Sequence, residues 1–338
     1  MRKIVFVLLA VAAIAFAASC EKEIQFNGDE TQSRLVLYSM ARSGEPLYAN
    51  ISSSVFFLKN HYDNKLFTSS LDTLKGSLKV YVNDSKTPYE MYRVHDENEY
   101  EEYYYYYYAF GTLRYRSDYV PSPGDRIRIT ASFPGFEDVE GETVVPNPGR
   151  FTLSSAKATL NANGYMDYDI SVHLEDDGSF RKYYAVVPLR WSSWDGGETF
   201  TKEYPLGISS QDPVFQNTSS DLIAIIEGET EENTPYYFSD ELFRGSSVDF
   251  RFSFTDFPGG AYIDYGDHME PDPNYKVSHT LEFSTLTPSL YNHVLSMRNI
   301  SYSDLGFLGE SSTLYSNVKG GYGCVCSSVS LSLPLNIE

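Results

Sequence analysis

The chain has 338 residues and a formal net charge of −20, from 26 lysines and arginines against 46 aspartates and glutamates. A chain this acidic lacks the basic footprint that nucleic-acid binding requires, so we expect no nucleic-acid partner. Its aromatic content of 15% comes mostly from 29 tyrosines, which suit strands and half-wet surfaces. Long windows rich in Ala, Leu, Glu and Lys are absent after residue 20, so the composition favours a mainly β chain.

The first 19 residues have the order of a lipoprotein signal peptide. Arg2 and Lys3 precede an uncharged apolar run over residues 4–16, and small residues stand directly before Cys20. The run is shorter than the ~20 residues of a transmembrane helix, and the order is that of an export signal. We therefore expect a lipid such as palmitate on Cys20 and an outer-membrane anchor, on the periplasmic or the extracellular face. The alternative is a plain signal peptide followed by an incidental cysteine.

Residues 20–33 are polar and acidic and are predicted to be a tether, so we expect the membrane to be contacted only through the lipid. After them, short stretches of alternating apolar and polar residues are separated by turn residues. This spacing predicts an immunoglobulin-like β-sandwich over residues 34–145. The expected strands are residues 34–38, 51–58, 78–82, 89–93, 126–131 and 142–146.

A Pro-Asn-Pro-Gly linker at residues 146–149 marks the predicted boundary to a second domain, residues 150–338. Pro288 and apolar residues at helical spacing predict one short helix over residues 288–299. Residues 195–235 are rich in loop-forming residues. We expect a second β-rich, sandwich-like domain, with strands at 168–174, 183–191, 248–254, 281–285, 314–318 and 322–333.

Two groups of aromatic residues are candidate ligand-binding positions. Residues 103–108 are six consecutive tyrosines that follow a glutamate-rich stretch. Tyr103, Tyr105 and Tyr107 would form an aromatic surface on one side of a strand, although a hairpin of biased composition explains the same residues. Trp191 and Trp194 are the second group, since stacked aromatic rings bind sugars. Aromatic residues near a strand end are more often part of a core or its rim.

Sequence signatures of catalysis are absent. The chain has no H-E-x-x-H, no G-x-S-x-G and no Walker loop, and its six histidines do not have metal-ligand spacing. Cys324 and Cys326 are too few for a structural zinc site and are expected to be small buried residues on one strand face. We therefore expect no catalytic residue, metal, cofactor or enzymatic activity. A glycan- or peptide-acting hydrolase with an unrecognised acidic pair is the less favoured alternative.

Three segments together carry a family resemblance. They are residues 238–245 (F-S-D-E-L-F-R-G), residues 281–291 (L-E-F-S-T-L-T-P-S-L-Y), and residues 307–310 (F-L-G-E) with 315–323 (Y-S-N-V-K-G-G-Y-G). With the signal at Cys20, the chain resembles the Bacteroidetes outer-membrane lipoproteins classed as domain of unknown function 4249, over about residues 20–326. It departs from the family at Ser311, where a proline is common, and at residues 324–326, which are commonly apolar or aromatic.

The resemblance implies a partner and not a reaction. Such proteins are typically encoded beside TonB-dependent outer-membrane receptors and are thought to work with them. We therefore expect an accessory lipoprotein that assists a TonB-dependent transporter by binding nutrient or receptor. The alternative is a surface adhesion or structural lipoprotein that uses the tyrosine run. Asn317, Gly320 and Gly321 are explained more simply as turn residues than as a ligand site.

Overall fold

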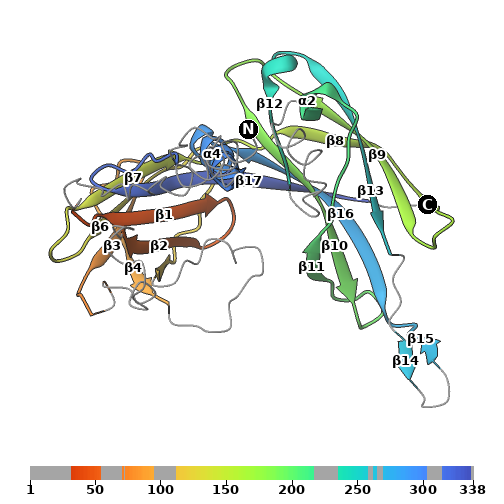
Figure 1. Cartoon of the computed structure of the whole chain (residues 1–338), viewed down its shortest axis with the longest axis horizontal. Helices are drawn as coiled ribbons and strands as arrows, with labels where there is room; N and C mark the ends of the chain where they lie inside the picture. The colour runs from red at the N-terminus through yellow and green to blue at the C-terminus, as the bar shows by residue number, and fades with distance from the viewer. Residues whose placement is uncertain are drawn as a thin grey trace, which may run out of the picture. The chain divides into compact units, whose positions relative to one another are not determined.

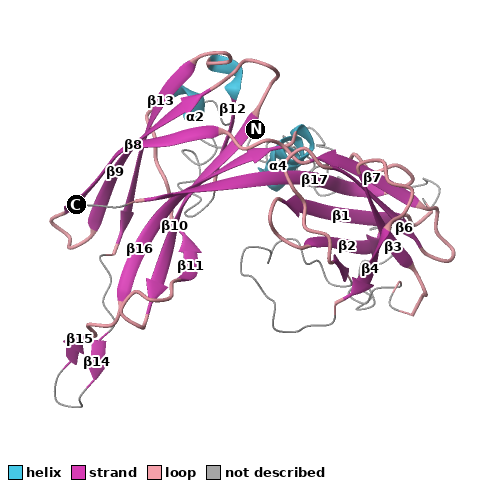
Figure 2. Cartoon of the chain, turned by 180° about the vertical axis from the view of Figure 1, so that it is seen from behind, coloured by secondary structure: helices cyan, strands magenta, loops and turns pink. Residues whose placement is uncertain are grey.

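The computed structural model describes residues 32–54, 71, 73–94, 112–216, 235–257, 262–264, 269–302 and 314–335. Strands dominate this part of the chain, which confirms the mainly β fold class (Figure 2). Most of them form a 12-stranded sheet, and the rest form a three-stranded sheet and a two-stranded ribbon. The predicted signal peptide, Cys20 and the tyrosine run with Tyr103, Tyr105 and Tyr107 lie outside the described residues.

The first group of strands encloses one apolar core. In β1 every second residue is buried, from Leu35 to Ala41, because alternate side chains of a strand point to opposite faces. The buried residues of the other strands join the same core. The group consists of β1 (Leu35–Arg42), β2 (Leu47–Ser53), β3 (Ser77–Val82), β4 (Tyr89–Arg93), β5 (Leu113–Ser117), β6 (Arg126–Ser132) and β7 (Val139–Val144).

The last strand, β17 (Tyr322–Pro334), takes part in both groups of strands (Figure 1). Its first half pairs in parallel with β1, up to the partners Arg42 and Ser328. Its second half pairs antiparallel with β16 (Lys276–Leu286). The hydroxyls of Thr143 on β7 and Ser327 on β17 lie 2.9 Å apart. β7 therefore returns to β17, and the first group of strands closes around its core.

The second group is a sandwich with an aromatic interior. Phe250, Phe252 and Phe254 project from alternate positions of one strand into this core, and Phe151 stacks on Phe283 with ring centroids 4.0 Å apart. One layer contains β8 (Arg150–Leu160), β9 (Met166–Glu175) and β13 (Ser247–Asp256), and the other contains β16, β17, β10 (Tyr183–Ser193), β11 (Thr201–Pro205) and β12 (Tyr236–Ser239). The remaining elements are α2 (Pro213–Gln216), η4 (Asp240–Leu242), α4 (Pro288–Tyr302), β14 (Tyr262–Asp264) and β15 (Met269–Pro271).

The predicted linker at residues 146–149 falls in the connection between β7 and β8. Residues 33–338 nevertheless form one compact unit, and β17 contributes to both groups of strands. The division into domains at residues 34–145 and 150–338 stays a prediction.

Three local features of the structure differ from the sequence-based predictions. Residues 314–318 do not form a strand. The side-chain amide of Asn317 donates to the backbone oxygen of Val325 at 2.8 Å and accepts from the backbone N–H of Val325 at 2.9 Å. A side chain therefore occupies the backbone groups with which a neighbouring strand would pair. Strand β8 was not expected, since a register shift between Leu153 and Ser155 breaks its alternation. Residues 201–205, expected in a loop-rich stretch, form strand β11.

Helix α4 begins where Thr287 and Pro288 follow β16. The Thr287 hydroxyl accepts a hydrogen bond from the backbone N–H of Leu290 at 3.4 Å, as a helix N-cap does. The same hydroxyl accepts from the N–H of Ser327 at 3.2 Å, which joins the helix to β17. Pro288 suits the first helical position, because it has no N–H to leave unsatisfied. In the described part of the chain, none of the helices has the length and apolar character to cross a membrane.

Replacing Thr287 with alanine is expected to lower the free energy of unfolding by about 1–2 kcal/mol, because a cap and a bond to β17 are lost together. Urea denaturation would measure the change. The matched control is Thr201→Ala, which removes an exposed threonine side chain and should change the stability by less than about 0.5 kcal/mol. Equal losses in the two variants would show that Thr287 does not cap the helix.

Candidate functional site

A buried ion-pair network lies at one end of the second group of strands. Arg190 of β10 is only 4% exposed. Its Nε donates to Glu203 at 2.6 Å, and its Nη1 donates to Asp256 and to the backbone oxygen of Phe257. Its Nη2 donates to the Tyr275 hydroxyl at 3.3 Å. We call Arg190, Glu203, Asp256, Tyr275 and His279 the ion-pair network.

The network places a charged carboxylate in an apolar interior. His279 of β16 lies 2.7 Å from Asp256, between its Nε2 and a carboxylate oxygen. Burial by itself would raise the pKa of Asp256, but the bond to His279 and the charge of Arg190 hold that pKa below its ordinary value. Burial opposes the charge of Arg190 as well, and hydrogen bonds with Tyr275, Asp256 and Glu203 raise its pKa. Both groups therefore stay ionised, and each stabilises the other.

Exposed aromatic rings surround this network. Tyr204 lies with its ring centroid 5.8 Å from the Arg190 guanidinium carbon. Phe257 accepts a hydrogen bond from Arg190 at its backbone oxygen. Its ring packs edge-on against the ring of Tyr165, with ring centroids 5.9 Å apart. The ring of Trp194 packs edge-on against the ring of Tyr275, with ring centroids 4.7 Å apart. We call Tyr165, Trp194, Tyr204 and Phe257 the aromatic rim, and between 44% and 66% of each of them is exposed.

The two predicted tryptophans have different surroundings. Trp191 is half-buried and donates its Nε1–H to the Thr280 hydroxyl at 2.9 Å, so it packs as a structural residue. Trp194 is 66% exposed and belongs to the aromatic rim. Ligand binding by Trp194 stays a prediction.

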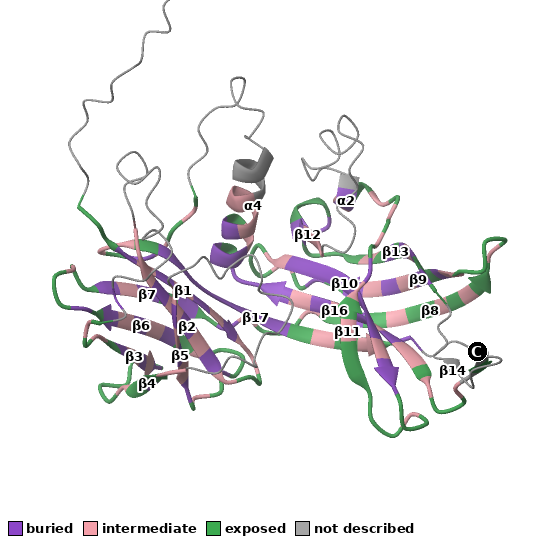
Figure 3. Cartoon of the chain, turned by 60° about the horizontal axis from the view of Figure 1, so that its bottom comes forward, coloured by how far each residue is buried: buried purple, intermediate pink, exposed green. Residues whose placement is uncertain are grey.

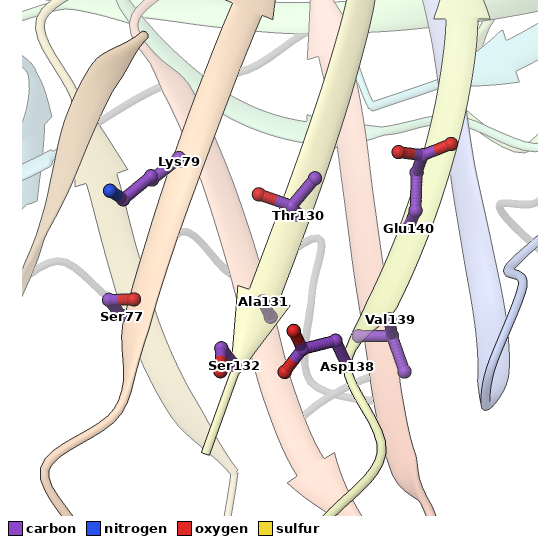
Figure 4. A pocket seen from close by; sticks show the side chains of 8 residues that line it. All are labelled: Ser77, Lys79, Thr130, Ala131, Ser132, Asp138, Val139 and Glu140. Carbon is purple, nitrogen blue, oxygen red and sulfur yellow. The ribbon is translucent and has the colours of Figure 1, made fainter.

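A second candidate is a depression of about 400 Å³ on the face of β3, β6 and β7 (Figure 4). Polar side chains line it, among them Lys79, Thr130 and Glu140. Lys79 pairs with Glu90 at 3.3 Å, and Glu140 pairs with Arg128 at 2.9 Å. Because these charges already have partners, the depression is a weaker candidate than the aromatic rim.

Sequence reasoning missed the ion-pair network, although two signals pointed to it. Asp256 continues the alternation of Phe250, Phe252 and Phe254, so a period of two places its carboxylate on the inward side. Arg190 interrupts an apolar run in a strand that is buried along most of its length. A charge at an inward position needs a partner of opposite charge.

Comparison with known proteins identifies the family. The model of the domain of unknown function DUF4249 matches residues 21–332. The chain belongs to the DUF4249 family. A search among curated proteins finds no match.

The first DUF4249 segment, residues 238–245, covers the end of β12, η4 and the turn before β13. The Asp240 carboxylate is fully buried and accepts from the backbone N–H of Lys182 at 3.0 Å. Gly245 donates its N–H to Asp176 at 2.6 Å, and Lys182 donates to the same carboxylate at 2.8 Å. These contacts give the segment a structural role in this DUF4249 protein.

The third DUF4249 segment has a structural role as well. Asn317 bonds the backbone of Val325, as described above. Gly320 has a φ of +79°, which favours glycine. An added Cβ at Gly321 would lie 2.2 Å from the backbone oxygen of Leu35. These observations agree with the expectation that Asn317, Gly320 and Gly321 are structural residues of a turn and do not form a ligand site.

Cys324 and Cys326 are buried, unbridged thiols on β17. They pack in a small apolar group with Leu286 and Leu290, as expected of small core residues. In the part of the chain that the structure describes, no three His, Cys, Asp or Glu side chains are arranged to hold a metal ion.

Proposed function

We propose that this DUF4249 protein is a lipid-anchored accessory protein that assists a TonB-dependent transporter by binding nutrient or receptor through the aromatic rim. The rim is the observation that carries the proposal. Tyrosine and tryptophan are enriched among the residues that dominate binding energy at interfaces. Exposed rings that already pack against neighbouring side chains lose little conformational freedom when a ligand binds.

The location and partner rest on the sequence. A lipid on Cys20 would hold the chain at the outer membrane, on its periplasmic or extracellular face. The TonB-dependent receptor is the partner that the family resemblance suggests. A chain held beside a transporter needs only modest affinity, because tethering raises the local concentration of the two partners.

We propose binding without catalysis. The three nitrogens of the Arg190 guanidinium are all engaged inside the network. The pKa of Asp256 is held low, which makes this carboxylate a poor general base near neutral pH. In this proposal Arg190 and Asp256 therefore support the rim and do not transfer protons to a substrate.

The proposal is tested with tagged protein from detergent-solubilised outer membrane of the native host. The wild-type chain should bring down a TonB-dependent transporter. Trp194→Ala should reduce either the recovered transporter or nutrient uptake about tenfold, because truncating an exposed anchor removes much of its binding energy. Leu242→Ala is the matched control, since Leu242 is an equally exposed apolar side chain outside the rim.

Two results would count against the proposal separately. If no transporter is recovered with the wild-type chain, the partner is wrong. If transporter recovery and uptake are both unchanged in Trp194→Ala, the rim is not the binding surface.

A further inference from the structure

Strand β8 is a long edge strand with one open side. Its 11 residues pair with β9, from Arg150 opposite Glu175 to Leu160 opposite Met166. Along its other side, no strand or loop in the described part of the chain forms a backbone pair with it (Figure 1). Unpaired N–H and C=O groups of such an edge are a template for another strand.

The opposite edge of the same sheet is covered. Ser209 and Ser253 of β13 exchange two backbone hydrogen bonds, at 2.8 and 2.9 Å. The Asp212 carboxylate accepts from the N–H of Arg251 at 2.7 Å. Among the described residues, the β13 edge of the three-stranded sheet is therefore covered and the β8 edge is open.

In the other layer of the sandwich, the second half of β17 is an edge that lies beside β8. The pairing of β1 with β17 stops at Ser328, so among the described strands only β16 pairs with the second half of β17. β17 also contacts β8. Leu331 and Leu333 from β17 are only partly buried in the shared core, and Leu160 at the end of β8 is 63% exposed. Figure 3 shows β8 mostly as exposed and intermediate residues. Apolar side chains are thus incompletely covered at this side of the sandwich.

The charges of β8 indicate which partner would fit. Its two charged residues are Arg150 and Lys157, both cationic and both exposed, and it contains no carboxylate. Arg150 lies 3.7 Å from Glu175 of β9, and both of these side chains are exposed to solvent. A second copy of β8 would place two more cations beside these two and would contribute no carboxylate, which disfavours self-pairing. An acidic strand would instead meet both cations with opposite charge.

We propose that β8 accepts an extended, acidic segment of a partner protein as an added strand. The backbone of the segment would pair with the open side of β8. Its apolar residues, at every second position, would cover Leu160 and the leucines of β17. Its carboxylates would face Arg150 and Lys157. This surface is distinct from the aromatic rim and needs no assumption about the proposed function.

The test uses the full chain in detergent and a capped eight-residue peptide of alternating Glu and Val. Hydrogen–deuterium exchange should show new protection of backbone amides within residues 150–160 when the peptide is added. Lys157→Glu should weaken binding of the labelled peptide about fivefold, because attraction becomes repulsion at an exposed site. Lys86→Glu makes the same charge change at an exposed turn and should leave the affinity unchanged.

Three results would overturn the proposal. The first is no protection of residues 150–160 at millimolar peptide. The second is equal binding of a peptide of alternating Lys and Val. The third is a dimer in size-exclusion chromatography whose β8 amides are already protected without peptide, because a second copy would then occupy the edge.

Discussion

Replacing Asp256 with asparagine is expected to lower the free energy of unfolding by about 3–5 kcal/mol, since breaking a buried ion pair leaves a buried charge uncompensated. Asp256 is the carboxylate that both Arg190 and His279 contact. Asparagine has nearly the same shape but no charge, so within the described part of the chain Arg190 would keep one anionic partner, Glu203. Guanidinium denaturation followed by fluorescence would measure the loss.

The loss in Asp256→Asn should depend on pH. The pKa of Asp256 is lower in the folded chain than its ordinary value. Its contribution to stability is therefore fully present above about pH 4, near the unfolded pKa. It is lost as the pH falls through the lowered folded pKa. The difference in unfolding free energy between wild type and variant should shrink over this acidic range.

The control for this experiment is Asp249→Asn on the same strand. Asp249 lies 2.7 Å from His173, but its side chain is 68% exposed. An exposed pair contributes little, so the control should lose less than about 1 kcal/mol. Equal losses of unfolding free energy in Asp249→Asn and Asp256→Asn would mean that the buried ion pair of Asp256 contributes no more to stability than an exposed pair.

Gly323→Ala should cost the fold about 4 kcal/mol or more. Gly323 is opposite Leu37 in the parallel pairing of β17 with β1, and its φ is +116°. A Cβ at this position would lie 1.9 Å from the backbone oxygen of Leu37. Because backbone atoms on both sides must shift, the pairing that closes the first group of strands would be disrupted.

A control variant at Gly124, which also has a positive φ, distinguishes the effect of the steric clash from that of backbone strain. Gly124 has a φ of +90°, and a Cβ there would meet no atom within 4 Å. Gly124→Ala should therefore cost only the strain of a left-handed residue, about 1–2 kcal/mol. Urea midpoints of both variants would be compared with the wild-type midpoint. A loss in Gly323→Ala no greater than that in Gly124→Ala would contradict the close approach of β1 and β17.

Prediction from the sequence succeeded where one residue pattern has one structural solution. The alternation in residues 248–254 predicts a strand, and β13 covers Ser247–Asp256. Pro288 with apolar residues at helical spacing predicts a helix, and α4 begins at Pro288. The same reasoning missed β8, because a register shift and small polar residues hide its alternation.

The candidate site was only partly predictable. Trp194 was a predicted ligand-binding residue and lies in the aromatic rim, whereas Trp191 is bound to Thr280 inside the sheet. The tyrosine run remains a prediction outside the described residues. Asp256 and Arg190 were recognisable as inward charges, but their contact joins residues 66 positions apart, and no local pattern states which distant residue will be the partner.

The sequence by itself determined the mainly β class, the positions of the strongly alternating strands, the start of α4 and the family resemblance. Each of these depends on spacing within a few residues, because strands and helices repeat with short fixed periods. Only the tertiary structure decided that β17 pairs with β1, that Asp256 contacts Arg190 and His279, and that no described strand pairs with the outer side of β8. Those outcomes depend on which apolar faces pack together across the whole chain, and packing between distant segments leaves no local period to read.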